Sequence, residues 1–214
     1  MPTVLLVRHA QGSFRTADYD VLSERGEQQA RALGADLRRR GIRVDRVVAG
    51  SLARQSRTAD PIAGAAGVEV EADARWDEYE TDDLIARHVA PEVMPTTTRE
   101  FQSLLDDALR AWVADRSAGA SWPAFRDRVC EALTELAGTL ESGECALVCS
   151  SGGPIAAVCV KLLGLPDDAL VAFNRVMVNG SVTKVVSGSA GMTLVSFNEH
   201  AYLEGPGGSL VSYR

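Results

Sequence analysis

The first strand candidate constrains this chain more than any other stretch, because apolar residues run directly into a charged pair. Residues 4–7 are Val-Leu-Leu-Val, and Arg8 and His9 follow at once. Four apolar residues, two of them β-branched, are typical of a buried strand. In an open parallel sheet, ligands bind beyond the carboxyl ends of the strands. The sequence therefore predicts that Arg8 and His9 lie at the ligand-binding edge of a sheet.

The composition limits the classes of protein to which the chain can belong. Its 214 residues are 46% hydrophobic, which suffices for one sizeable core, so we expect a single domain over residues 1–214. The formal net charge of -7 argues against a nucleic-acid partner, which requires a basic face. Any anionic ligand must therefore meet a local cluster of arginines.

The apolar runs and the cysteines bear on the compartment. Only four apolar residues separate Thr3 from Arg8, and no apolar run in the sequence approaches the length of a membrane span. We expect a soluble cytoplasmic protein with no membrane partner. The four cysteines form no Cys-x-x-Cys pair and have no histidine at zinc spacing. We interpret them as small core residues, with no disulfide, no metal and no cofactor.

Strand and helix patterns alternate along most of the chain, which indicates an α/β fold. After a polar loop over residues 11–20, Ser23 can cap a helix that Gly41 ends, with Arg38 to Arg40 suiting its C-terminal dipole. The buried stripe of this helix is predicted at Ala30, Leu33, Gly34 and Leu37. Further strands are predicted at residues 47–49, 68–71, 145–149, 181–186 and 193–197. Residues 68–71 alternate apolar and acidic side chains, as in an edge strand with one face exposed to solvent.

Residues 80–120 break this rhythm and predict a small helical cap inserted above the sheet. Two helical stretches flank residues 91–98, and residues 117–121 look like a connector. The second stretch presents one apolar face, at Phe101, Leu104, Leu105, Ala108 and Trp112. A long helix then follows and is stopped by Gly143, with its stripe at Phe125, Val129, Ala132, Leu133, Leu136 and Leu140.

Two turns at strand ends are suited to anions. Ser51 is the predicted N-cap of a helix with Arg54 in its first turn, where an arginine opposes the helix dipole unless an anion is bound. Amide groups behind Ser51 and the Arg54 guanidinium predict a phosphate site, and a solvated surface arginine is the alternative. Farther along, Gly152 and Gly153 allow close backbone approach and Pro154 suits the first helical position. A second anion site is expected there.

Glu78 is a candidate general acid. It lies between Trp76 and Tyr79, and aromatic neighbours that remove water from a carboxyl group favour its protonated form. The alternative is that the two aromatic residues anchor the core and that Glu78 is a solvent-exposed neighbour.

Together these residues resemble the histidine phosphatase, or phosphoglycerate mutase-like, superfamily. The resemblance covers nearly the whole chain and rests on the order of several degenerate motifs: residues 7–10, Leu22 with Gly26, Gln29 and Ala30, Ser51 and Arg54 with Thr58 and Ala59, Asp77 and Glu78, Phe125 with Arg128 and Val129, and residues 152–154. It implies a three-layer sandwich, in which a mostly parallel mixed sheet of about six strands lies between helices. The active site would lie at the strand ends.

The resemblance also implies a role for each site residue. His9 would be the nucleophile that forms a phosphohistidine, and Arg8 and Arg54 would bind the phosphoryl oxygens. Glu78 would protonate the leaving oxygen and then accept a proton from the attacking water. Gly152 would offer its backbone amide to the phosphoryl group, and the scheme requires no metal.

This chain departs from the family pattern at three positions. Ala10 stands where a glycine is usual, and Gln11 where a carboxylate is frequent. Ser151 stands where the family usually has a second histidine. A serine can still bind the phosphoryl group through its hydroxyl, but it carries no positive charge, so we expect a slow enzyme. Gln11, Ser13 and His88 are candidates for auxiliary roles, and His200 is expected to be structural.

Three functions remain open from the sequence. The first, which we favour, is a phosphatase acting on a small phosphomonoester, with mutase activity less favoured because the chain is short and the second histidine is absent. The second is a catalytically weak or silent phosphate-ligand binding protein. The third is a serine hydrolase that uses Ser151, with Asp167 and His200 following in the order of an α/β-hydrolase triad.

Overall fold

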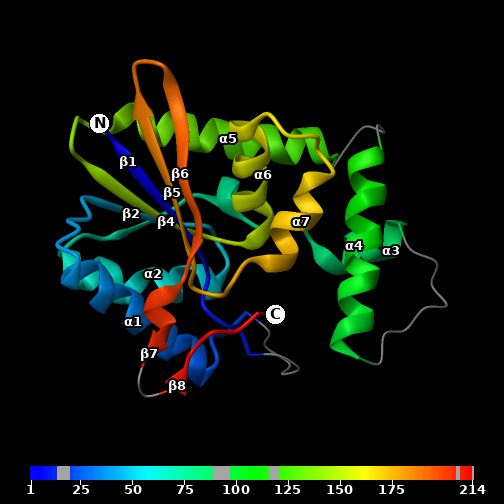
Figure 1. Ribbon diagram of the computed structural model, residues 1–214, viewed down its shortest axis with the longest axis horizontal. Helices are drawn as coiled ribbons and strands as arrows, with labels where there is room; N and C mark the ends of the chain where they lie inside the picture. Colours follow the sequence, from blue (N-terminus) through cyan, green and yellow to red (C-terminus); the bar gives the residue numbers. More distant parts are fainter. Residues whose placement is uncertain (14–19, 89–96, 116–120, 206–207, 214) are drawn as a thin grey trace.

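The computed structural model describes residues 1–13, 20–88, 97–115, 121–205 and 208–213 (Figure 1). The helices of this part of the chain are α1 (Glu24–Arg39), α2 (Ala53–Ala66), α3 (Thr81–His88), α4 (Thr98–Ala114), α5 (Trp122–Thr139), α6 (Gly152–Leu163) and α7 (Ala169–Val176), with the 3₁₀ helices η1 (Ala74–Trp76) and η2 (Ala201–Leu203). The strands are β1 (Thr3–Arg8), β2 (Arg46–Ala49), β3 (Val70–Ala72), β4 (Cys145–Ser150), β5 (Val182–Gly188), β6 (Gly191–Glu199), β7 (Glu204–Gly205) and β8 (Gly208–Ser209).

Six strands form one mixed sheet in the order β3-β2-β4-β1-β5-β6. Strands β1 to β4 are parallel to one another. β5 runs antiparallel to β1, and β6 runs antiparallel to β5. The predicted α/β class is therefore confirmed, and the last two predicted strands form an antiparallel hairpin at one side of the parallel part.

Helices cover both faces of the sheet, because alternate residues of each strand face opposite layers. On one face, α1 and α2 contribute Leu33 and Ile62 to a core with Leu5 and Val7 of β1. On the other face, α5 and α6 pack their apolar residues against Leu6 and its neighbours in β2 and β4. Figure 1 shows the resulting three layers, with α1 and α2 below the sheet and α5 and α6 above it.

The predicted cap helices α3 and α4 lie beside α7, at one side of the sandwich (Figure 1). The stripe of α4 is buried as predicted at Leu104, Leu105, Ala108 and Trp112, whereas Phe101 is half-buried. Leu105 and Trp112 belong to the same apolar cluster as Leu6 of β1. The cap is thus held to the sandwich by a continuous core.

Several predicted boundaries need correction. The strand predicted at residues 68–71 begins at Val70, although it is an edge strand as expected. α5 ends at Thr139, before the predicted stop at Gly143. α7 was not predicted, because its eight residues offer too short a pattern. Residues 14–19 of the predicted polar loop, residues 91–96 between the cap helices and residues 117–120 of the predicted connector lie outside the described residues.

The four cysteines are free thiols, and three of them are buried. Burial raises the pKa of Cys145 to about 11 and that of Cys159 to about 12, because the thiolate would lose its hydration. Within the described ranges, no helix is both long enough and apolar enough to cross a bilayer.

Candidate active site

Adjacent strand ends bring the predicted site residues together. β1 and β4 pair in parallel with Arg8 opposite Ser150, and the His9 amide donates to the Ser150 carbonyl at 2.7 Å. His9 and Ser151 are therefore neighbours at the carboxyl edge of the sheet. Arg8 and His9 are only 6% and 7% exposed, and Arg8 Nη1 donates to the Met177 carbonyl oxygen. The predicted placement of the Arg-His pair agrees with this geometry.

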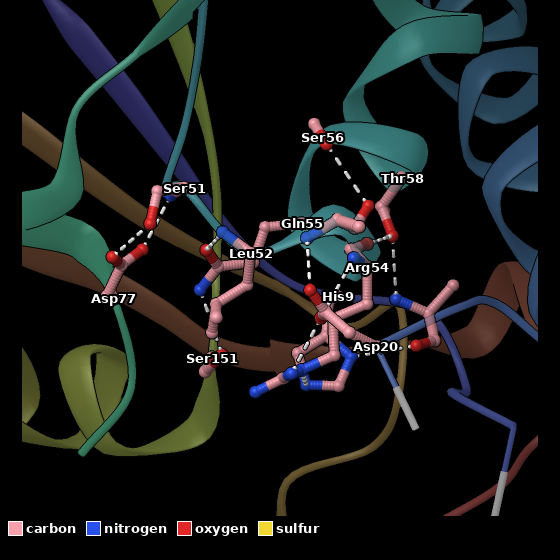
Figure 2. Close-up of polar contacts among 12 residues, drawn as sticks. His9, Asp20, Ser51, Leu52, Arg54, Gln55, Ser56, Thr58, Asp77 and Ser151 are labelled. Carbon is pink, nitrogen blue, oxygen red and sulfur yellow. Dashed lines mark hydrogen bonds and ion pairs between the residues drawn. The ribbon is translucent and has the colours of Figure 1, made fainter. Parts of the chain in front are cut away.

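The two ring nitrogens of His9 have different partners, from which its tautomer is assigned. Nδ1 lies 2.8 Å from the Ala10 carbonyl oxygen, and Nε2 lies 3.2 Å from Arg54 Nε. Because a carbonyl only accepts and a guanidinium only donates, Nδ1 carries the proton and Nε2 offers its lone pair. His9 thus presents a neutral imidazole with a nucleophilic Nε2, next to a fixed positive charge (Figure 2).

Asp20 binds Arg54 and occupies the anion site that the sequence predicted at the N-terminus of α2. The N-cap of α2 is Leu52, not Ser51. The Asp20 carboxylate accepts hydrogen bonds from the Ala53 and Arg54 amides at 2.7 and 3.3 Å, and it pairs with Arg54 Nη1 at 2.8 Å. The anion that the helix dipole requires is therefore a side chain of this same protein. Arg54 still directs its Nε towards His9.

Ser51 instead anchors the segment that carries Glu78. Its amide and its hydroxyl both donate to the Asp77 carboxylate, at 2.6 and 2.5 Å. Arg128 Nη2 donates to the Asp77 carbonyl oxygen at 2.9 Å from the other side. The preceding 3₁₀ turn is capped by Asp73, whose pKa the Arg75 guanidinium holds below its usual value. The backbone that presents Glu78 is thus tied to the turn after β2 and to α5.

The Glu78 carboxylate lies at the N-terminus of α6. Both of its oxygens accept from the Gly153 amide, at 3.1 and 3.2 Å. A Cβ at Gly153 would lie 2.1 Å from Glu78 Oε1, so only glycine permits this approach. Trp76 and Tyr79 are buried anchors, and Glu78 itself is half-buried. The predicted glycine turn therefore exists, but Gly152 opens the helix and Pro154 stands third, not first.

Ser151 is fully buried and forms a pair with Gln55, which sequence reasoning missed. The Gln55 amide nitrogen donates to Ser151 Oγ at 3.0 Å and to the Trp76 carbonyl at 3.2 Å, and Gln55 Oε1 accepts from the Leu52 amide at 3.3 Å. Arg54 and Gln55 are consecutive residues of α2. Arg54 donates to His9 and Gln55 donates to Ser151, the two neighbours at the strand ends (Figure 2). Ser151 Oγ thus accepts a hydrogen bond from the protein itself, and the residue is buried from solvent.

The structure gives each auxiliary candidate a defined neighbour. The Gln11 side chain accepts from Ser23 Oγ at 3.0 Å, so it is bound to the N-cap of α1. Ser13 donates its amide to the Val21 carbonyl at 2.7 Å. His88 ends α3 and lines a cavity of about 430 Å³ together with Glu78.

The proposed serine-hydrolase triad is not assembled. Ser151 pairs with Gln55, and Asp167 pairs with Arg126 at 3.0 Å. His200 Nδ1 lies 2.6 Å from the Asn198 carbonyl oxygen, and its Nε2 lies 3.8 Å from Glu204. In the part of the chain that the structure describes, no three His, Cys, Asp or Glu side chains form a metal-binding group.

Comparison with known proteins identifies the family. Residues 4–200 match the model of the histidine phosphatase superfamily, branch 1. The chain is 32% identical over 173 residues to a probable phosphoglycerate mutase GpmB of Citrobacter koseri, covering 78% of this chain and 77% of that protein.

Solved structures of similar fold include two phosphatases. A phosphoserine phosphatase variant of Entamoeba histolytica, in complex with phosphoserine, has a TM-score of 0.69 at 20% identity, over 95% of this chain and all of that one. A mycobacterial glucosyl-3-phosphoglycerate phosphatase with inorganic phosphate has a TM-score of 0.68 at 24% identity, over 94% and 99% of the two chains. The family match over residues 4–200 shows that this chain belongs to the histidine phosphatase superfamily, branch 1.

Proposed function

We propose that the protein is a metal-independent phosphatase that hydrolyses a small phosphomonoester through a phosphohistidine on His9. The observation that carries this proposal is the hydrogen bond that Arg54 Nε donates to His9 Nε2 at 3.2 Å, which assigns the proton of the neutral ring to Nδ1. A neutral imidazole beside a guanidinium suits in-line attack on a phosphoryl group, whose oxygens need fixed positive charge.

The proposed reaction has two steps. His9 Nε2 attacks phosphorus while the ester P–O bond breaks, and Glu78 gives its proton to the leaving alkoxide. Water then attacks the phosphohistidine, Glu78 takes a proton from that water, the N–P bond breaks and phosphate leaves. Arg8, Arg54 and the Gly152 amide stabilise the charge on the phosphoryl oxygens in both steps.

Ser151 favours a slow enzyme over a fast one. Its hydroxyl is neutral, and it accepts from Gln55 at 3.0 Å in a fully buried position. A charged side chain at this position would donate a preorganised hydrogen bond to the phosphoryl group. Losing one such donor typically lowers turnover by roughly a hundred- to thousandfold.

The decisive experiment compares native protein with His9→Ala. We expect native protein to release phosphate from p-nitrophenyl phosphate and to form an acid-labile phosphoenzyme in rapid quench, and we expect the variant to do neither while its circular dichroism is unchanged. Turnover that survives in His9→Ala would refute the phosphohistidine.

The same assays separate the alternatives. Interconversion of 2- and 3-phosphoglycerate without net phosphate release would indicate a mutase, as the name of the Citrobacter koseri relative suggests for that protein. Phosphate binding without phosphoenzyme or turnover would indicate a silent binding protein.

A further inference from the structure

A polar cavity of about 670 Å³ lies between α4 and α7, and Arg8 forms part of its wall. Arg99 and Asp106 line it from α4, and Asn174 and Arg175 line it from α7. The reaction proposed above gives this cavity no role, although it shares one arginine with the phosphoryl site.

The wall of the cavity is built around a buried carboxylate. Asp106 is 3% exposed, and it accepts from Arg175 Nε at 3.0 Å, from Arg175 Nη2 and from Gln102 Nε2 at 2.8 Å. These bonds fix the Arg175 guanidinium at the junction of α4 and α7. The Arg175 side chain is nevertheless 53% exposed, so it also faces solvent.

The cavity carries an excess of positive charge. Three arginines and one aspartate line it, which leaves two more positive than negative groups. Arg99 is exposed and has no carboxylate within ion-pair distance among the residues that the structure describes. The whole chain has a net charge of -7, so this local excess opposes the general trend of the surface.

Asn174 connects the cavity to the phosphoryl site. A Cβ placed on Gly152 would lie 2.6 Å from Asn174 Oδ1 and 4.0 Å from Arg8 Nε, so these three residues adjoin. Asn174 Nδ2 also donates to the Tyr79 hydroxyl at 3.4 Å, one residue beyond Glu78. A ligand whose phosphoryl group touches Arg8 and Gly152 therefore has the cavity directly beside it.

We propose that this cavity binds a second anionic group of the substrate, a carboxylate or a second phosphate, with Arg99 and Arg175 as its donors. The proposal rests on the proposed function, because it places the phosphoryl group at His9. It predicts that preferred substrates are phosphomonoesters whose alcohol part carries its own negative charge. The cavity beside Glu78 has a different character, since Tyr79, Trp112 and Phe125 line it, and it suits an apolar alcohol.

The test uses two substrates with the same three-carbon skeleton. 3-Phosphoglycerate carries a carboxylate where glycerol 3-phosphate carries a hydroxymethyl group. Arg99→Met removes the charge at an exposed position, so the fold should be retained. Arg110→Met is the matched control, because Arg110 is on the same helix and pairs with Asp107 at 2.9 Å but does not line the cavity.

We expect Arg99→Met to lower kcat/KM for 3-phosphoglycerate by about tenfold or more, since a hydrogen bond to a charged group is lost. The value for glycerol 3-phosphate should stay within about twofold, and Arg110→Met should change neither. Propane-1,3-diol bisphosphate, which carries a second phosphate and no carboxylate, is assayed in the same way and distinguishes a second phosphate from a carboxylate.

Equal losses on both substrates, or the same loss in Arg110→Met, would overturn the proposal. The protein could instead prefer phenyl phosphate to 3-phosphoglycerate, with no change in that preference in either arginine variant. That result would overturn the proposal and place the alcohol part of the substrate in the aromatic cavity beside Glu78. If native protein hydrolyses none of these esters, the proposed function fails. Calorimetric binding of 3-phosphoglycerate to native and Arg99→Met protein then still decides whether the cavity binds anions.

Discussion

Replacement of Ser151 by histidine restores the residue type usual in the family, yet we expect it to fail as a single change. Gln55 lies against Ser151 with its amide nitrogen 3.0 Å from the hydroxyl, and both residues are fully buried. Gly50 makes room for this arrangement, since a Cβ there would lie 2.0 Å from Gln55 Oε1. The space that an imidazole would need beside Ser151 is already filled.

The expected cost follows from overpacking a filled site. Inserting a larger side chain into a packed interior typically destabilises by about 1–3 kcal/mol. For a chain of this size each kcal/mol lowers Tm by about 2–4 °C, so Ser151→His should lower Tm by about 2–12 °C. Turnover should not rise, because the ring cannot reach a productive position while Gln55 remains.

The double variant Ser151→His with Gln55→Ala removes the obstruction. It should raise turnover above native by up to roughly a hundred- to thousandfold, the usual value of one preorganised donor. Gln55→Ala alone is the control, and it should lose stability without gaining activity. Thermal unfolding and p-nitrophenyl phosphate turnover of the four proteins decide the matter. A single Ser151→His variant with native Tm and higher turnover would show that Gln55 does not block the site.

Three further changes test the surrounding groups. Glu78→Gln should slow hydrolysis of glycerol 3-phosphate more than that of p-nitrophenyl phosphate, because a good leaving group needs little acid, and equal losses would remove Glu78 from that role. Asp20→Ala should lower stability by about 1 kcal/mol in thermal unfolding, as loss of a helix cap does, and an unchanged Tm would contradict its contacts with α2. Gly153→Ala should displace Glu78 and lower activity, whereas Gly138→Ala, where a Cβ meets nothing within 4 Å, should leave activity native.

The sequence predicted the sheet and the strand-end residues because those signals are local. Residues 4–7 form a buried strand that delivers Arg8 and His9 to the sheet edge, as the apolar run before the charged pair predicted. The glycine turn after β4 opens α6 in the same way, since Gly152 and Gly153 are adjacent in the chain and need no distant partner.

The contacts that orient the site were not predictable, because they join residues far apart in the chain. Asp20 meets Arg54 across 34 positions, and Gln55 meets Ser151 across 96. Neither pair leaves a pattern in the local sequence. Ser51 was wrongly predicted as an N-cap because its residue type is right, whereas its hydroxyl is taken by Asp77. Long-range partners of this kind meet only when the chain has folded.

Two acidic side chains of this chain already bind backbone amides at helix N-termini, where they compete with any anion that binds from solution. Asp20 occupies amides of α2, and Glu78 occupies the Gly153 amide of α6. A group tethered in the same chain competes at an effective concentration on the order of millimolar. Under the proposed reaction, inorganic phosphate that reaches towards Gly153 must therefore displace Glu78, and the return of the Glu78 side chain to the Gly153 amide favours departure of the product. Removal of the Glu78 carboxyl group would then slow chemistry and tighten product inhibition together, a pairing that a simple loss of fold cannot produce.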